Sequence, residues 1–208
     1  MIAVVDYGMG NLRSVQKGLE RVGFEAEVTR DPGRIADARG VVLPGVGAFH
    51  SCMENLERFG LVDVIRDVVR RKRPFLGICL GLQLLFDESE EFGSPDGLGL
   101  VPGKVLGFCA ADDLKVPHMG WNAIEIRKPT RFLEGIDDAS QVYFVHSFYA
   151  APADESMVAT VTSHGTPFVS SIATDHLFAC QFHPEKSQAI GLRILENFGR
   201  FAENEAAA

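Results

Sequence analysis

The feature that most constrains the fold is an alternation of short apolar runs with helical segments over the first 80 residues. Apart from Glu25 and Glu27, the apolar runs contain no regularly spaced polar residues, and the helical segments between them carry apolar residues at a spacing of three or four. The apolar runs are residues 2–5, 25–29, 41–43 and 75–78, and the helical segments are 12–22, 51–58 and 61–71. Such alternation is typical of a parallel sheet covered by helices on both faces. Ligands of these sheets bind at the carboxyl ends of the strands.

The second half of the chain has a different pattern, with short apolar runs separated by turns. These runs are residues 104–108, 121–126, 141–149, 157–162, 168–173 and 177–182. They indicate strands that are at least partly antiparallel. A final helix is predicted from Ile190, Ile194, Phe198 and Phe201, which share one stripe. We therefore expect one α/β domain over residues 1–208, with a mostly parallel, doubly wound sheet and antiparallel strands in its C-terminal half.

Composition excludes several classes of function. The chain has 208 residues, of which 46% are hydrophobic, and a formal net charge of -8. An acidic balance argues against a nucleic-acid partner. No apolar run approaches the roughly 20 residues that cross a bilayer, and the N-terminus does not resemble a secretory signal, so we expect no membrane association and a cytoplasmic location. Four cysteines lie far apart and form no Cys-x-x-Cys pair, which suggests neither a disulfide framework nor a metal site; they are Cys52, Cys79, Cys109 and Cys180.

The strongest chemical signal is the sequence Gly-Ile-Cys-Leu-Gly at residues 77–81, between the predicted strand 75–78 and a predicted helix 80–86. It is the thiol counterpart of the Gly-x-Ser-x-Gly nucleophile elbow. Side chains at Gly77 or Gly81 would crowd the turn, and a helix N-terminus favours a thiolate. An isolated cysteine in an apolar run is also often a small buried residue. The motif alone leaves both interpretations of Cys79 open.

A base for this thiol is available near the C-terminus, where His183, Pro184 and Glu185 follow an apolar run. Residues two apart in extended backbone project to the same side, so the Glu185 carboxylate can orient the His183 imidazole. A thiol nucleophile requires such a base and an orienting group. The combination favours a Cys79, His183 and Glu185 triad.

An acyl-transfer triad also requires donors for the oxyanion. The N–H of Leu80, which follows the nucleophile, is one candidate by analogy with the hydrolase elbow. The Pro-Gly-Val-Gly segment 44–47 is the candidate for the second donor, because its glycines allow close backbone approach. A plain strand-to-helix turn is an equally open interpretation of this segment.

Residues 77–83 and 182–185 resemble the class I, triad-type glutamine amidotransferases. Within that family, further segments are similar to the glutaminase subunits of imidazole glycerol phosphate synthases, and the similarity covers almost the whole chain. These segments are residues 6–12, 43–49, 117–122, 144–147 and 183–188. The resemblance implies hydrolysis of glutamine to glutamate and ammonia without a cofactor. It also implies a (β/α)8 barrel cyclase partner in a heterodimer, which forms imidazole glycerol phosphate and an aminoimidazole carboxamide ribonucleotide in histidine biosynthesis.

The resemblance also implies roles for individual residues. Cys79 is the nucleophile, His183 the acid and base, and Glu185 its orienting group, with the amides of Val46 and Leu80 at the oxyanion. The glutamine head is held by Gly47, Gln83, His146 and Ser147, and the face toward the cyclase is lined by Met119, Trp121, Tyr143 and Lys186. The sequence itself also permits Gln83 to face solvent, and His146 and Ser147 to bond only backbone groups.

The chemistry of ammonia also indicates that the chain acts with a partner protein. Free ammonia is mostly protonated near neutral pH and is then a poor nucleophile, so a useful glutaminase must deliver it through a shielded passage. Three alternatives remain at this point. The chain could serve another synthase, such as that of pyridoxal phosphate, could be an inactive scaffold, or could be a cysteine protease with the same triad.

Overall fold

The computed structural model describes residues 1–93, 95–108 and 115–205 of the chain, so Cys109 lies outside the described residues. Its helices are α1 (Leu12–Arg21), α2 (Pro32–Asp37), α3 (Phe49–Arg58), α4 (Val62–Arg70), α5 (Leu80–Gln83) and α6 (Gln188–Glu205). Short 3-10 turns are η1 (Arg131–Leu133), η2 (Glu155–Met157) and η3 (Pro184–Lys186). The strands are β1 (Ile2–Val5), β2 (Ala26–Thr29), β3 (Gly40–Gly45), β4 (Phe75–Cys79), β5 (Phe86–Ser89), β6 (Val101–Gly107), β7 (His118–Ala123), β8 (Glu125–Ile126), β9 (Gln141–His146), β10 (Phe148–Pro152), β11 (Val158–His164), β12 (Thr166–Ala173) and β13 (Leu177–Cys180).

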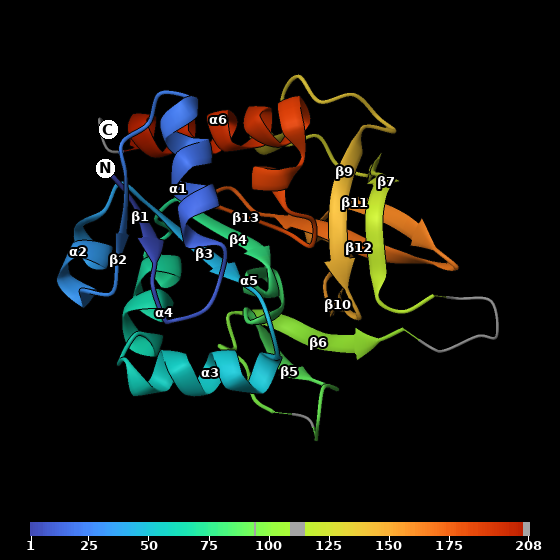
Figure 1. Cartoon of the computed structure of the whole chain (residues 1–208), viewed down its shortest axis with the longest axis horizontal. Helices are drawn as coiled ribbons and strands as arrows, with labels where there is room; N and C mark the ends of the chain where they lie inside the picture. Colours follow the sequence, from blue (N-terminus) through green and yellow to red (C-terminus); the bar gives the residue numbers. More distant parts are fainter. Residues whose placement is uncertain (94, 109–114, 206–208) are drawn as a thin grey trace.

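The main sheet has a parallel core in the order β2-β1-β3-β4-β13. Helices α1 and α6 cover one face of this core, and α3 and α4 cover the other (Figure 1). The predicted doubly wound α/β class is confirmed. Because the three neighbours β3, β4 and β13 are parallel, their carboxyl ends lie side by side at one edge.

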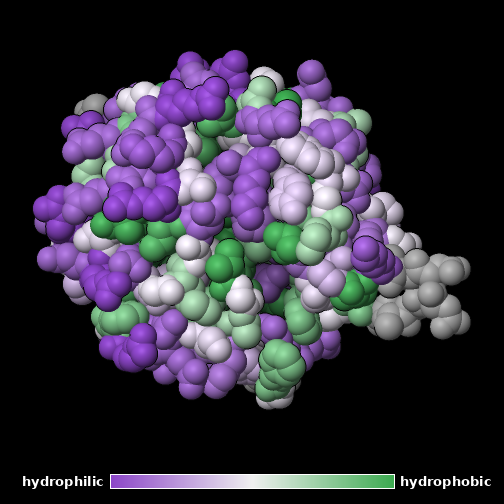
Figure 2. Space-filling view, viewed as in Figure 1, coloured by the Kyte–Doolittle hydropathy of each residue, from purple (hydrophilic) through white to green (hydrophobic). Residues whose placement is uncertain are grey.

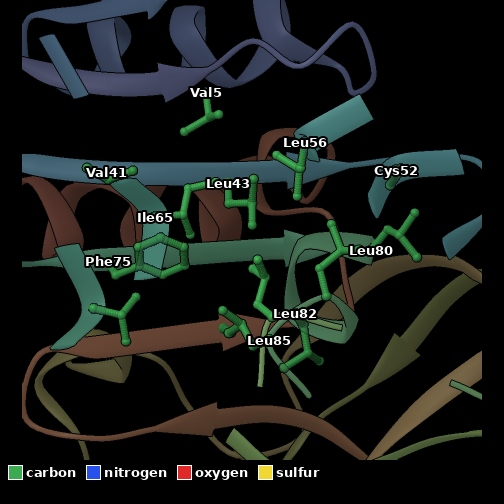
Figure 3. Close-up of a cluster of buried hydrophobic side chains, with 14 of the residues drawn as sticks. Val5, Val41, Leu43, Cys52, Leu56, Ile65, Phe75, Leu80, Leu82 and Leu85 are labelled. Carbon is green, nitrogen blue, oxygen red and sulfur yellow. The ribbon is translucent and has the colours of Figure 1, made fainter. Parts of the chain in front are cut away.

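Side chains that alternate along these strands divide the core into two hydrophobic clusters. Val5, Leu43 and Phe75 pack with α3 and α4, as the close-up of the first cluster shows for these strands (Figure 3). Val4 and Leu76 pack with α1 and α6 on the opposite face. Each fully buried side chain of this size contributes about 1.5–3 kcal/mol. Burial on both faces explains why these strands are continuously apolar in sequence.

The C-terminal half is largely antiparallel, as expected. Strands β12, β10 and β6 continue the main sheet in antiparallel pairs, and β11 and β8 extend it from β12. Strands β7 and β9 form a separate antiparallel pair, in which His118 lies opposite His146 and Trp121 opposite Tyr143. This pair lies beside the end of the parallel core that carries Cys79 (Figure 1).

Two local predictions need correction. The helix predicted over residues 80–86 ends at Gln83, because the carbonyls of Leu84 and Leu85 accept hydrogen bonds from residues 98, 100 and 101. Tertiary pairing therefore replaces the helix, and β5 begins at Phe86. Helix α2 was not predicted, although Asp31 accepts from the N–H groups of residues 33 and 34 as an N-cap.

The outer surface is mixed in polarity. Figure 2 shows hydrophobic side chains gathered across the middle of the viewed face, with hydrophilic ones dominating the upper part around α1 and α6. Among the residues that the structure describes, no helix combines the length and apolar character needed to span a bilayer.

Candidate active site

Three neighbouring strand ends bring the predicted catalytic residues together. Strand β3 ends at Gly45, which pairs with Cys79 at the end of β4, and β13 ends at Cys180, which pairs with Ile78. The segment after β3 supplies Val46, and the segment after β13 supplies His183. Sequence separation is therefore large, but the parallel register places these groups at one sheet edge.

Cys79, the predicted nucleophile, lies on a strained turn, as the elbow motif predicts. Cys79 has φ 54° and ψ -111°, in a region that side chains rarely adopt. A Cβ atom on Gly81 would lie 1.9 Å from the Leu43 carbonyl oxygen, and one on Gly77 would lie 2.9 Å from the Gly81 carbonyl oxygen. Both flanking glycines are therefore required by the close approach of the backbone.

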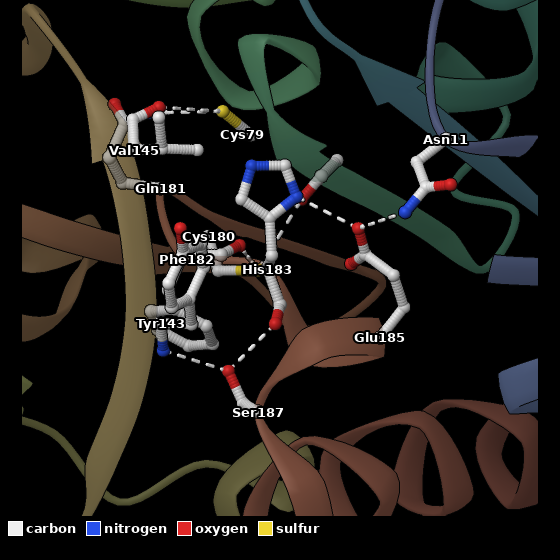
Figure 4. Close-up of polar contacts among 11 residues, drawn as sticks. Asn11, Cys79, Tyr143, Val145, Cys180, Gln181, Phe182, His183, Glu185 and Ser187 are labelled. Carbon is white, nitrogen blue, oxygen red and sulfur yellow. Dashed lines mark hydrogen bonds and ion pairs between the residues drawn. The ribbon is translucent and has the colours of Figure 1, made fainter. Parts of the chain in front are cut away.

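His183 and Glu185, the predicted base and its predicted orienting group, are buried together. His183 Nδ1 lies 2.8 Å from Glu185 Oε1, and both side chains are 1% exposed. Figure 4 shows the other ring nitrogen on the side of His183 nearest Cys79, and this Nε2 atom has no hydrogen-bond partner among the described residues. The Ser187 hydroxyl donates to the His183 carbonyl at 2.7 Å and accepts from the N–H of Tyr143 at 3.0 Å. The carboxylate of Glu185 and the hydroxyl of Ser187 therefore hold His183 in place, and the Nε2 edge of its ring faces Cys79.

Electrostatics favour a protonated base. Burial by itself lowers the pKa of His183, but the neighbouring thiol of Cys79 and the carboxylate of Glu185 raise it to about 10. Burial raises the pKa of Cys52 to about 11 and that of Cys180 well above its ordinary value. Both of those thiols are free and buried.

Cys79 and His183 line a cavity of about 450 Å³ together with other predicted site residues. Its lining includes Cys79, His183, Val46, Leu80, Gly47, Gln83, His146 and Ser147. Leu80 is the first residue of α5, so its N–H has no partner within the helix. Val46 and Leu80 line the same cavity as Cys79, and an oxyanion site made by their amides stays a prediction.

The His146 side chain is held by hydrogen bonds within the protein, and a contact of this residue with glutamine stays a prediction. Its Nδ1 atom lies 2.9 Å from the Phe148 carbonyl oxygen, and its Nε2 atom lies 2.9 Å from His118 Nδ1. Both ring nitrogens are already engaged, so the imidazole offers no free polar atom to glutamine. Gln83 donates both amide hydrogens, one to the main-chain carbonyl oxygen of Phe148 and one to the side-chain oxygen Oε1 of Gln181, which leaves its own Oε1 as the atom that can accept from a ligand.

Several functional side chains were missed by the sequence analysis. Gln181 donates to the Cys79 sulfur at 3.7 Å, and Asn11 donates to Glu185 Oε1 at 3.4 Å. Glu91 lines the cavity, with one carboxylate oxygen 2.6 Å from the N–H of Phe49. A polar residue inside the apolar run 177–182 was the available signal for Gln181. Nothing local indicates the roles of Asn11 or Glu91.

The residues expected at a partner interface lie on the β7–β9 pair and on η3. Met119 is 61% exposed and Trp121 is 47% exposed. The Trp121 and Tyr143 rings meet edge to face, with centroids 6.1 Å apart, and the Lys186 ammonium lies 5.7 Å from the Tyr143 ring centroid. Exposed aromatic and methionine side chains of this kind are enriched at protein interfaces.

A larger hollow, of about 760 Å³, lies over β10, β11 and β12. Its described lining includes no cysteine or histidine, and the Lys128 ammonium there already donates to the carbonyls of Ser156 and Ala173. The smaller cavity, whose lining includes Cys79 and His183, is therefore the better candidate for the active site.

Known proteins identify the family of the chain. Residues 3–200 match the family described as glutamine amidotransferase class-I. Imidazole glycerol phosphate synthase subunit HisH of Syntrophotalea carbinolica is 55% identical over 204 residues, which cover 96% of this chain and 99% of that protein. The protein of the same name from Aquifex aeolicus is 53% identical over 201 residues, 96% of each chain. A crystal structure of a glutamine amidotransferase, 19% identical, shares the fold with a TM-score of 0.76 over 98% of this chain and 100% of that one. The chain belongs to the class-I glutamine amidotransferase family and, within it, to the imidazole glycerol phosphate synthase subunit HisH family.

Proposed function

We propose that the chain hydrolyses glutamine to glutamate and ammonia through Cys79, His183 and Glu185. The observation that carries the proposal is the buried His183–Glu185 pair at 2.8 Å, whose free imidazole nitrogen borders the same cavity as the strained Cys79. A thiol, a base and an orienting carboxylate are the three parts of a hydrolytic triad.

The chemistry follows from this arrangement. The Cys79 thiolate attacks the side-chain amide carbon of glutamine, and the oxyanion accepts hydrogen bonds from the amides of Val46 and Leu80. Protonated His183 donates its Nε2 proton to the departing nitrogen, which leaves as ammonia, and a thioester remains on Cys79. Neutral His183 then removes a proton from water, which attacks the thioester and releases glutamate. Glu185 holds the ring in one orientation throughout.

Glu91 favours a free amino acid over a peptide as the substrate. Its carboxylate lines the cavity, and one of its oxygens is held by the N–H of Phe49. A carboxylate complements the charged α-ammonium group of free glutamine, which a residue inside a peptide lacks. The oxygen of Gln83 and the backbone of Gly47 and Ser147 provide further polar contacts. These features argue against the protease alternative.

We further propose that the ammonia passes to a (β/α)8 barrel cyclase subunit in a heterodimer, for histidine biosynthesis. The names of the relatives support this partner over the pyridoxal phosphate alternative, since these relatives are subunits of imidazole glycerol phosphate synthase. Exposed Met119 and Trp121, with Tyr143 and Lys186 beside them, provide the docking surface.

The proposal is tested by measuring glutamate and ammonia release from glutamine, with and without the cyclase subunit and its ligand. We expect activity that rises strongly with the partner, disappears in Cys79→Ala and persists in Cys180→Ala, the matched control with a second buried thiol. Full activity in Cys79→Ala would exclude the triad. Absence of hydrolysis under all conditions would favour the scaffold alternative.

A further inference from the structure

Five buried or half-buried side chains beside the cavity are connected by hydrogen bonds, directly or through one backbone carbonyl. We call them the polar network. Its members are Asn122, His118, His146, Gln83 and Gln181. The first two belong to β7, which also exposes Met119 and Trp121, and the last contacts the sulfur of Cys79.

The part of the network on β7 and β9 runs inward from the surface. Asn122 Nδ2 lies 3.1 Å from His118 Nε2, and His118 Nδ1 lies 2.9 Å from His146 Nε2. His146 Nδ1 lies 2.9 Å from the carbonyl oxygen of Phe148. All three distances are those of formed hydrogen bonds.

The second part connects that carbonyl to the nucleophile. Gln83 Nε2 lies 2.9 Å from the Phe148 carbonyl oxygen and 2.9 Å from Gln181 Oε1. Gln181 Nε2 in turn lies 3.7 Å from Cys79 Sγ. The Phe148 carbonyl therefore accepts from both sides, and the amide orientations of both glutamines are determined by their partners.

The positions of the protons in the network follow from these contacts. A carbonyl oxygen only accepts, so His146 carries its hydrogen on Nδ1 and its Nε2 accepts from His118 Nδ1. The remaining nitrogen of His118 then accepts from Asn122. Both rings are neutral in this arrangement, because burial lowers the pKa of His118 to about 4 and that of His146 to about 3. Each histidine therefore has one defined tautomer.

We propose that His118 is a positioning residue for the nucleophile, which acts through the polar network to hold the Gln181 amide against the Cys79 sulfur. The N–H of Gln181 stabilises the thiolate in that position. His118 is 5% exposed and is absent from the cavity lining, so it has no direct route to the substrate. This inference rests on the proposed function only in taking Cys79 as the nucleophile.

The test is the rate at which iodoacetamide alkylates Cys79 in the full-length chain, followed by mass spectrometry of the peptide that contains Cys79. Gln181→Leu removes the donor to the sulfur, and we expect alkylation about tenfold slower. His118→Phe keeps an aromatic ring against Phe144 but cannot donate, and we expect a rate about fivefold slower. His118→Gln provides a donor and an acceptor, and it should restore the rate to within about twofold.

The matched control is His164→Phe. His164 stacks on His118 at a centroid distance of 4.2 Å, but its Nε2 atom bonds to the Lys115 carbonyl, outside the network. We expect its alkylation rate to stay within about twofold of the unaltered chain. A similar loss in His164→Phe and His118→Phe, or no recovery in His118→Gln, would reduce His118 to a packing residue and overturn the proposal.

A measurement on the unaltered protein keeps the proposal testable if a variant does not fold. Nitrogen-15 NMR should find His118 and His146 protonated at Nδ1 and unprotonated at Nε2 near neutral pH; the Nε2–H form of either ring overturns the network. Alkylation requires no glutamine turnover. A chain that shows the expected alkylation pattern but hydrolyses no glutamine refutes the proposed function alone, and glutamine hydrolysis without that pattern refutes the network alone.

Discussion

The parallel and antiparallel halves of the sheet bury different kinds of side chain. Strands β1 and β4 are apolar and fully buried, and the buried polar side chains of residues 1–86 are Thr29 and Gln83. Strands β7 to β12 bury a much more polar set, namely His118, His146, Thr160, Thr162, Ser170 and Ser171, and buried Gln181 follows β13. The apolar half forms a rigid platform for a strained cysteine, whereas the polar half orients the groups that act on it.

The triad crosses the boundary between these halves. Cys79 ends the last strand of the apolar half, and His183 follows β13, which is parallel to β4 and antiparallel to β12. Strand β13 therefore joins the two kinds of core. Substitutions in each half should therefore have different consequences.

The largest effect is expected where the polar half orients the base. Glu185→Gln leaves an amide that does not enforce the tautomer of His183, so kcat for glutamine hydrolysis should fall about 10³- to 10⁴-fold, as for other triads. The rate of ammonia release from saturating glutamine at steady state measures this fall in kcat. Glu196→Gln on α6, whose carboxylate pairs only with exposed arginines among the described residues, is the control and should be nearly unchanged. A loss below tenfold in Glu185→Gln would remove Glu185 from the triad.

In the apolar half, adding a side chain at Gly81, beside Cys79, should destabilise the fold. Gly81→Ala places a Cβ 1.9 Å from the Leu43 carbonyl oxygen, so we expect a loss of about 3 kcal/mol in the free energy of unfolding. Gly107→Ala, on β6 in the antiparallel half, meets only Phe148 ring carbons from 3.4 Å and should change stability by less than about 0.5 kcal/mol. Urea unfolding compares the two. Equal effects would contradict the difference in backbone packing between the halves.

The buried charge pair should make stability depend on pH. Because the pKa of His183 is raised to about 10 in the folded state, its contribution is fully present below the unfolded value near 6.5 and is lost as pH rises toward 10. The stability advantage of the unaltered chain over Glu185→Gln should therefore shrink by about 2 kcal/mol between pH 6 and pH 10. Urea unfolding across that range measures it. An advantage that grows with pH would mean that His183 is neutral in the folded chain.

A smaller effect is expected for the hydroxyl cluster of the antiparallel half. Thr160 Oγ1 lies 2.8 Å from Ser170 Oγ and 2.6 Å from Ser171 Oγ. Thr160→Val leaves buried hydroxyls without that partner, so we expect a loss of about 1–2 kcal/mol in unfolding free energy. The reciprocal change in the apolar half, Val42→Thr, should also destabilise because it buries an unpaired hydroxyl. If both changes were neutral, the two cores would not differ energetically.

The contrast between the apolar and the polar half also explains which features the sequence could predict. Local apolar runs predicted strands over residues 2–5 and 75–78, which the structure confirms as β1 and β4. The glycine-flanked elbow and the spacing of His183 and Glu185 led to the proposed triad. The polar network was not predictable, because its partners are far apart in sequence; Gln83 and Gln181 are separated by 98 positions. The helix over residues 80–86 was wrong for the same reason, since hydrogen bonds from residues 98–101 end it.

The central claim is that Cys79 is the nucleophile for glutamine. Its most direct test is covalent labelling with an electrophilic glutamine analogue in the presence of the cyclase subunit, followed by peptide mass spectrometry and ammonia assay on the same sample. We predict label on Cys79 alone, protection by excess glutamine, and loss of ammonia release in proportion to labelling. Ammonia release that persists when Cys79 is fully labelled would contradict the account.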